Sequence, residues 1–364
     1  MLFSIIIAAI AVCVDCVNLW LYWLIRFRKV RAELIPLVGG CLGCVAILTS
    51  GIEHAGIWSL CAFLIDPGSC FVLRFLLGRC CSLALQIILK TPCVLTIPGM
   101  SHLMRILMAW ETVDVCLYKS YRSGGAMVRI GALVFTQSQV LECDKFCHGR
   151  ARQAAKGLIR VVDDDVLEAA QKMDRPLVLS FANAHVPGGG FWLGAASQEE
   201  SICRRSTLYA SLTAKSSAKL YRANNWHPRL AGADLIVYSP RVLVFRDVSG
   251  HFLKSPYEVS VASCAAPNRR FLASLLSSDK LVGVFRRRIR AILSLARDQG
   301  HRNIVLGAWG CGAFGNDPKL VAECFRYVLV DEGYSSAFDE VVFAISGRRS
   351  RSMRDVFTSV LGEC

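Results

Sequence analysis

Two short stretches near the middle of the chain contain the residue types that could bind an anion and transfer a proton. Three consecutive glycines at positions 188–190 leave the backbone free to adopt positive φ and to present successive N–H groups to a phosphate. The sequence Gln-Glu-Glu follows at 198–200, after a spacer of seven residues. Because a site that only held phosphate would avoid carboxylates, we expect the glutamates to transfer a proton or to bind the hydroxyls of a sugar.

A purely structural role for the same stretch stays open. Ser197 and Glu200 have the spacing of a capping box, in which the Ser197 hydroxyl accepts from the N–H of Glu200 and the Glu200 side chain reaches back to the N-cap. Capping boxes are common, and a triple glycine alone is weak evidence for a phosphate site. This stretch alone therefore favours neither explanation.

The flanking residues predict the elements that position these groups. Residues 175–180 form a short apolar run that is typical of a buried strand, and the spacing of Ile202, Leu208 and Leu212 predicts a helix after the motif. Neighbouring residues on a regular helix diverge, so Glu199 and Glu200 can face one sugar only where the loop turns into the helix. Their position in the sequence predicts that they lie at this point.

A second glycine-rich loop lies near the end of the chain, at residues 310–316. It follows residues 303–309, which we predict to be a strand, and it again offers small residues and free N–H groups. Ligands of open α/β sheets bind at the carboxyl ends of the strands. We therefore expect this loop to contribute to the ligand site.

The two loops together resemble the signature of the microbial-type poly(ADP-ribose) glycohydrolase catalytic domain, a macrodomain-like family. The resemblance rests on NAHVPGGGF at 183–191, QEE at 198–200, CRRSTLY at 203–209 and GAWGCGAFGNDP at 307–318. It covers the chain from Arg105 to the C-terminus. It implies that residues 105–364 form the catalytic domain, with an α/β fold that is a macrodomain-like three-layer α/β/α sandwich containing a mixed sheet.

The resemblance also implies a reaction, which is hydrolysis of ribose–ribose O-glycosidic bonds in poly(ADP-ribose) with release of ADP-ribose. In the matching roles Glu200 is the general acid/base and Glu199 holds ribose hydroxyls. Asn183 binds the distal ribose, Phe314 orients the terminal ribose and Cys311 is structural. The residues expected at the substrate are Asn183, Gly188, Gly189, Gly190, Gln198, Gly310, Cys311, Gly312, Ala313, Phe314, Gly315 and Asn316. We expect no metal or other cofactor, since residues 105–364 contain no His or Cys cluster with ligand spacing.

Three other functions stay open. The domain could bind ADP-ribose without hydrolysis, although a binding module has no use for the acid of Gln-Glu-Glu. It could remove mono-ADP-ribose from protein or nucleic acid, or it could be a scaffold attached to a membrane. A Cys203–His185 nucleophile pair is disfavoured because nothing marks Cys203 as a thiolate. Asn183 could instead satisfy a turn, and Phe314 could pack within its own domain.

The charge of the chain is compatible with a polyanionic partner. The 364 residues have a formal net charge of +14, with arginine-rich clusters at 204–205, 269–270, 286–288 and 348–354. A surface of this kind attracts polyanions, and solvated helix faces are the alternative. The expected partners are poly(ADP-ribose) or ADP-ribosylated proteins and no sequence-specific nucleic acid. We expect the catalytic domain to be monomeric.

The first 104 residues are overwhelmingly apolar and rich in cysteine. Residues 1–25 have the length of a membrane span, with aromatic residues near their end and basic residues directly after them. Later apolar stretches, at 35–49, 57–65 and 71–97, are short or interrupted. We expect one or more transmembrane helices here, hence membrane association with the catalytic domain facing the cytosol. If this region is absent from the mature protein, we expect a cytoplasmic or nuclear enzyme.

The remaining periodicity predicts the alternating strands and helices of an α/β sandwich. The predicted strands are 128–135, 177–180, two runs around Pro240 within 234–247, 256–266, 303–309 and 341–345. The predicted helices are 104–121, 163–173, 281–300, 317–330 and 354–361.

Two CxxC pairs, at 13–16 and 41–44, lie in apolar runs and are expected to be buried rather than to bind zinc. The later cysteines show no framework spacing, which indicates a reducing compartment.

Overall fold

The computed structural model describes residues 100–131, 138–146, 157–226, 229–347 and 350–362. All of them belong to one unit of the chain, Thr96–Cys364. Among these residues no helix has both the length and the apolar character needed to cross a membrane. The predicted spans and both CxxC pairs lie outside the described residues.

The core of the fold is a seven-stranded mixed sheet with the strand order β3-β6-β7-β5-β8-β9-β4. Strands β5, β8, β9 and β4 run parallel, and β7 is parallel to β5, whereas β6 is antiparallel to both β7 and β3. The strands are β3 (Gln139–Glu142), β4 (Leu158–Val162), β5 (Leu177–Phe181), β6 (Leu235–Arg246), β7 (Phe252–Cys264), β8 (Asn303–Leu306) and β9 (Glu340–Ala344). The predicted α/β class with a mixed sheet is confirmed, although β3 and β4 were not predicted.

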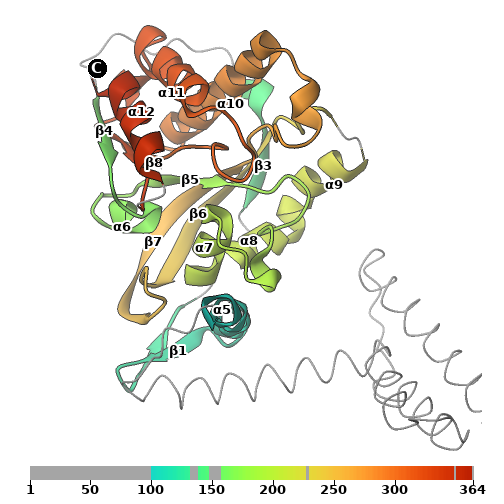
Figure 1. Cartoon of the computed structure of the whole chain (residues 1–364). Helices are drawn as coiled ribbons and strands as arrows, with labels where there is room; N and C mark the ends of the chain where they lie inside the picture. The colour runs from blue at the N-terminus through green and yellow to red at the C-terminus, as the bar shows by residue number, and fades with distance from the viewer. Residues whose placement is uncertain (1–99, 132–137, 147–156, 227–228, 348–349, 363–364) are drawn as a thin grey trace, which may run out of the picture. The chain divides into compact units, whose positions relative to one another are not determined.

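Helices cover both faces of this sheet (Figure 1). The helices are α5 (Met100–Tyr118), α6 (Val166–Gln171), α7 (Gln198–Arg205), α8 (Leu208–Thr213), α9 (Ala218–Trp226), α10 (Ser278–Asp298), α11 (Pro318–Arg326) and α12 (Arg351–Leu361). Side chains alternate along β5, so Leu177 and Leu179 pack with α10, α11 and α12, while Val178 packs with α6, α7 and α8. A sheet buried on both faces explains why β5 reads as a continuous apolar run.

Strand β6 differs from its prediction as two separate runs. It continues through Pro240 because the register shifts between Ser239 and Val242, where β6 has one more residue than β7. Such a bulge accommodates a proline that cannot donate to the ladder. Arg241 takes the left-handed conformation there, with φ 57°. Residues 126–129 form β2, which pairs with β1 (Ser120–Ser123) in a separate hairpin, and residues 132–137 of the predicted strand lie outside the described residues.

Helix α5 is attached to the sheet by a buried arginine. Arg246, at the end of β6, has no exposed surface and donates to the Glu111 carboxylate at 2.7 Å and to Thr112 Oγ1 at 2.7 Å. It also donates to the carbonyl of Arg204 at 2.7 Å, and Thr112 donates to the same carbonyl at 2.6 Å. The guanidinium thus connects α5, the end of β6 and helix α7, which holds the two glutamates.

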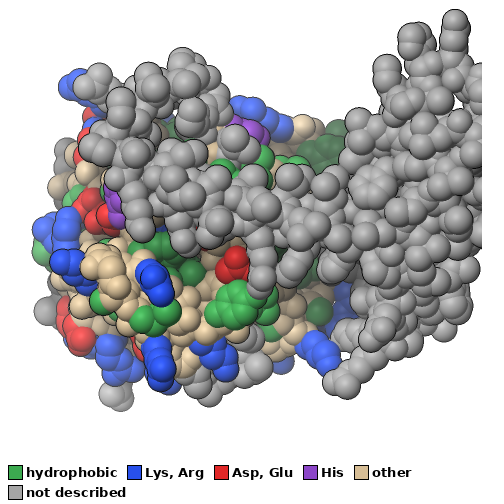
Figure 2. All heavy atoms as spheres, turned by 90° about the horizontal axis from the view of Figure 1, so that it is seen from below, with side chains coloured by type: hydrophobic (Ala, Val, Ile, Leu, Met, Phe, Trp, Pro, Cys, Tyr) green, Lys and Arg blue, Asp and Glu red, His purple; other side chains and the backbone are tan. Residues whose placement is uncertain are grey.

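Several arginines of the predicted basic clusters are buried structural residues. Arg205 is 3% exposed and forms ion pairs with Asp165 at 2.6 Å and with Glu168 at 2.8 Å. Arg288 is fully buried and bonds Asp234 at 2.7 Å. These buried side chains cannot attract a polyanion, and they are not part of a solvated helix face. Both explanations predicted for the basic clusters are therefore wrong for Arg205 and Arg288. In the coloured part of the face in Figure 2, Lys and Arg side chains are scattered among neutral and acidic ones.

Candidate active site

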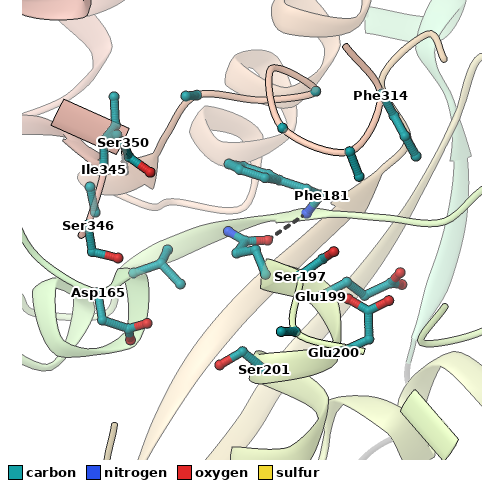
Figure 3. Close-up of a pocket in the computed structure, with 18 of the residues that line it drawn as sticks. Asp165, Phe181, Ser197, Glu199, Glu200, Ser201, Phe314, Ile345, Ser346 and Ser350 are labelled. Atoms are coloured by element: carbon teal, nitrogen blue, oxygen red, sulfur yellow. Dashed lines mark hydrogen bonds between the residues drawn. The ribbon is translucent and has the colours of Figure 1, made fainter. Parts of the chain in front are cut away.

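Helix α7 begins directly against the end of strand β5. The Gln198 side chain accepts from the Phe181 N–H at 2.8 Å (dashed line in Figure 3) and donates to the Leu179 carbonyl at 2.9 Å. Both groups of the amide therefore bind backbone of the strand. This attachment places Glu199 and Glu200 in the first turn of the helix, as the sequence predicts.

Glu199 is 2% exposed, and one of its carboxylate oxygens is anchored. Oε2 accepts from the Asn183 N–H at 2.7 Å, whereas Oε1 has no hydrogen-bond partner among the described residues. Burial raises the pKa of Glu199 well above its usual range. The N–H groups of Asn183 and Gly188 lower this pKa, and the neighbouring Glu200 carboxylate raises it further. Glu199 therefore favours the protonated form more than an exposed glutamate does.

Glu200 is 7% exposed and is anchored in a similar way. Oε1 accepts from the Gly190 N–H at 2.9 Å, and within the described part of the chain Oε2 has no partner. Ser197 is the N-cap residue, but its side chain makes no capping hydrogen bond. The capping-box explanation is wrong, because the Glu200 side chain binds the glycine loop and not the helix N-terminus.

The triple-glycine loop encloses these carboxylates. A Cβ on Gly189, which has φ +53°, would lie 2.5 Å from Glu200 Oε1 and 3.3 Å from Glu199 Oε2. The Gly189 N–H donates to the Val186 carbonyl at 3.0 Å, and the Gly190 N–H donates to Glu200. Two of the three N–H groups thus donate to protein acceptors, and the third, that of Gly188, faces Glu199 and lowers its pKa, so the predicted phosphate role of this loop stays a prediction.

An aromatic cluster packs against the triple-glycine loop. Phe191 is fully buried and stacks on Tyr209 with ring centroids 4.2 Å apart, and Trp192 Nε1 donates to the Tyr209 hydroxyl at 2.7 Å. Trp192 also packs edge-on against Trp110 of α5 at 5.1 Å. Beside it, burial raises the pKa of the Cys203 thiol well above its usual range, which argues against a thiolate nucleophile, as expected.

The second glycine loop is held by two of its own residues. Asn316 is 2% exposed, and its amide nitrogen donates to the carbonyls of Pro267 at 2.8 Å and Gly310 at 3.0 Å. Cys311 Sγ contacts the Trp309 carbonyl at 3.8 Å, and burial raises the pKa of this thiol to about 12. Both side chains maintain the shape of the loop, which agrees with the structural role expected for Cys311.

The second glycine loop and the first turn of α7 border a cavity of about 640 Å³ at the carboxyl ends of β5, β8 and β9. Figure 3 shows the Glu199 and Glu200 carboxylates pointing the same way at one end of it, with Phe314 across from them. Of the predicted site residues, those that line the cavity are Asn183, Gln198, Glu199, Glu200, Gly310, Gly312, Ala313 and Phe314. Those that do not line it are Gly188, Gly189, Gly190, Cys311, Gly315 and Asn316.

The other end of the cavity was not predicted. It is formed by Asp165, Ile345, Ser346, Ser350 and Met353 (the first four are labelled in Figure 3). Most of these residues follow strands β4 and β9, and the rule that ligands bind at the carboxyl ends of parallel strands could have identified them. Since β4 was not recognised as a strand in the sequence, its end could not be placed at the site.

The raised pKa of Glu199 predicts a pH-dependent stability. Its contribution to folding is complete below the unfolded pKa of about 4.3 and is lost as the pH rises towards the higher folded pKa. Glu199→Gln removes this titration, and its amide oxygen can still accept from the Asn183 N–H. We expect the Tm of the variant minus that of wild type to become more positive from pH 5 to pH 8 in thermal unfolding. The control is Glu323→Gln, at an exposed site; a constant difference for Glu199→Gln would contradict the burial argument.

The fold and the site together define an α/β protein with a paired-carboxylate cavity of the kind that glycoside hydrolysis requires. The family model "Microbial-type PARG, catalytic domain" matches residues 109–247. The structure is similar to the poly(ADP-ribose) glycohydrolase of Thermomonospora curvata, with 35% identity, a TM-score of 0.66, and coverage of 71% of this chain and 99% of that one. None of the curated proteins matches.

Two further solved structures support the same assignment. The T. curvata enzyme bound to the inhibitor ADP-HPD has 34% identity and a TM-score of 0.65, covering 70% of this chain and 98% of that one. The Deinococcus radiodurans enzyme in complex with ADP-ribose has 31% identity and a TM-score of 0.59, covering 65% and 99%. The chain belongs to the microbial-type poly(ADP-ribose) glycohydrolase family and is an enzyme of that class.

Proposed function

We propose that this chain hydrolyses the ribose–ribose O-glycosidic bond of poly(ADP-ribose), with Glu200 as general acid/base and Glu199 as the group that positions the ribose. The observation that supports this most directly is the pair of buried carboxylates at the cavity. Each has one oxygen anchored by a backbone N–H, and the described residues provide no partner for the other oxygen. A buried carboxylate oxygen without a donor is costly for folding, so a role towards a ligand explains its presence.

The anchoring contacts determine which oxygen of each glutamate is available. Glu200 Oε1 is bound by Gly190, so Oε2 protonates the leaving 2′-oxygen and afterwards takes a proton from the attacking water. Glu199 Oε2 is bound by Asn183, which leaves Oε1 for a ribose hydroxyl. Its raised pKa allows Glu199 to donate as well as accept in that hydrogen bond. The anchors hold both groups before substrate arrives, which reduces the cost of ordering them in the transition state.

The rest of the cavity binds the remainder of an ADP-ribose unit. Phe314 lies across the cavity from the carboxylates (Figure 3). In the proposed complex its ring packs on the terminal ribose. Gly312 and Ala313 line the same cavity, and a Cβ on Gly312 would meet nothing within 4 Å, so backbone there is open to a pyrophosphate. The hydroxyls of Ser346 and Ser350 at the far end face the adenosine.

Gly189→Ala tests the contact between the loop and the acid. A methyl group there would lie 2.5 Å from Glu200 Oε1, so we expect the carboxylate to move and kcat to fall by about tenfold, since misplacement costs rate. The control is Gly333→Ala, which has a similar positive φ of +79° but nothing within 4 Å. It shares the backbone strain without the contact. Equal kcat values for the two variants would show that the loop does not position Glu200.

The test of the proposed function is release of free ADP-ribose by the full chain. Purified poly(ADP-ribose) and a mono-ADP-ribosylated protein are supplied separately, and the product is quantified by chromatography. Release from the polymer is the expected result. Release only from the mono-modified protein would establish the alternative hydrolase, and binding of ADP-ribose without release from either would establish a binding module.

A further inference from the structure

A second, smaller cavity adjoins the site just described. It has a volume of about 130 Å³, and Asn183 and Phe314 line both cavities. Asn183 also donates its N–H to Glu199, so the shared wall is in direct contact with the carboxylate pair. The second cavity therefore begins where the proposed reaction takes place, on the other side of Phe314 from the cavity that holds an ADP-ribose unit.

The two cavities differ in charge. The first contains Asp165, Glu199 and Glu200, whereas no carboxylate is among the residues that line the second. The charged or titratable side chains there are Arg229 and His185. Arg229 also lines a neighbouring cavity with Glu142, Asp144 and Asp234. The amides of Asn183, Asn224 and Asn268 also line the wall, where Asn224 is bonded to backbone through both its amide groups and Asn183 and Asn268 accept backbone N–H groups through Oδ1. A cavity lined by a cation and by no carboxylate suits a phosphorylated ligand.

An exposed aromatic ring stands at this cavity. Phe271 lines it and is 64% exposed. Its turn is held in place, because Asn268 accepts from the N–H groups of Phe271 at 3.1 Å and of Ala273 at 3.2 Å. The N–H of Arg269 donates to the Phe314 carbonyl at 2.9 Å, which ties the turn to the second glycine loop. An exposed ring on a hydrogen-bonded turn, at a cavity that Arg229 also lines, is an arrangement on which nucleic acid bases stack.

We propose that the second cavity binds the leaving side of the substrate, the penultimate ADP-ribose unit of the polymer. This inference rests on the proposed function. The unit attached to the scissile bond continues past Phe314, its adenine stacks on Phe271, and Arg229 pairs with its phosphates. A cavity of this size is smaller than a complete small-molecule site, so it holds one ring of the unit while the rest extends outside. The contacts in the second cavity therefore contribute to kcat/KM on the polymer, and they contribute nothing on a substrate in which a single ADP-ribose carries a small leaving group.

The test compares two substrates that share the terminal ADP-ribose and differ in the leaving group. One is poly(ADP-ribose), and the other is ADP-ribose joined through C1″ to a small chromogenic phenol. For Phe271→Ala in the full chain we expect kcat/KM on the polymer to fall roughly tenfold, with the phenol substrate unchanged. Arg229→Gln should weaken the polymer reaction in the same selective way and reduce its dependence on salt.

The control is Leu275→Ala, which removes another exposed apolar side chain, 71% exposed, from the same segment but outside the cavity. It should affect neither substrate. The inference is overturned if Phe271→Ala leaves polymer cleavage unchanged, or if it slows both substrates equally, as a structural defect would. Wild type that cleaves neither substrate would instead contradict the proposed function, so the two failures are distinguishable.

Discussion

Glu200→Gln is expected to lower kcat for ADP-ribose release by about 10²- to 10⁴-fold, the usual contribution of general acid/base catalysis. The amide is nearly isosteric with the carboxylate, and its oxygen can still accept from the Gly190 N–H that anchors Glu200 Oε1. The loop geometry is therefore preserved, and only the ability to give and take a proton at Oε2 is lost. ADP-ribose should still bind, because the two loops and Phe314 are unchanged.

Two measurements distinguish a chemical from a structural effect of this variant. Rates of release from poly(ADP-ribose) report the chemistry, and calorimetry with ADP-ribose reports binding. Glu199→Gln is the matched control on the neighbouring residue, and it should raise KM more than it lowers kcat, since Glu199 is proposed to hold a ribose hydroxyl. A Glu200→Gln enzyme with the wild-type rate would exclude Glu200 as the acid. Loss of both rate and binding would indicate a disturbed loop instead.

Arg246→Met is expected to lower the free energy of unfolding by about 3–5 kcal/mol, the cost of removing one partner from a buried ion pair. Arg246 is fully buried, and its removal leaves the Glu111 carboxylate without this ion-pair partner and the carbonyl of Arg204 with Thr112 as its donor in place of two donors. Burial lowers the pKa of Arg246 to about 10, so the guanidinium is still charged at neutral pH. Chemical denaturation followed by circular dichroism measures the change.

The matched control lies on the same strand. Arg241 pairs with Glu258 at 2.9 Å, but both side chains are largely exposed, so Arg241→Met should unfold close to wild type. If the two variants were equally stable, the buried contacts of Arg246 would contribute nothing beyond a surface pair. Because Arg246 also bonds the carbonyl of Arg204 in α7, we expect Arg246→Met to reduce activity under conditions where it is still folded.

Much of the catalytic half of the site was predictable from local sequence. The spacing of Gly189 and Glu200 indicated a loop against a helix N-terminus, and β5 lies where the apolar run predicts it, whereas the helix predicted from Ile202, Leu208 and Leu212 is divided at Ser206 into α7 and α8. These features are determined over a few residues, by glycine conformations and by apolar periodicity. The resemblance to the family rested on the same short motifs, and the solved structures confirm it.

Features that depend on contacts between distant residues were not predictable. The local sequence indicates that Arg205 belongs to a surface cluster, but Arg205 is buried. Its partner Asp165 is 40 residues away in the sequence, so the local sequence does not show the ion pair. The glycine N–H groups looked free for phosphate, yet Gly190 donates to Glu200 once the helix folds back on the loop. Composition reports how many charges the chain has, whereas only tertiary packing pairs them, because the energy of a charge depends on its neighbours and on the water removed around it.

The catalytic residues lie in contiguous segments of the sequence, whereas the residues proposed to select the substrate are brought together only by folding. The order of the residues along the chain was sufficient to identify the carboxylates and the two loops, since each lies within one contiguous segment. The cavity beyond Phe314 is assembled from segments around His185, Arg229 and Phe271 that are separated in sequence. Burial, exposure and the absence of a carboxylate among the residues lining that cavity exist only after folding, because they are properties of neighbours in space and not of neighbours along the chain.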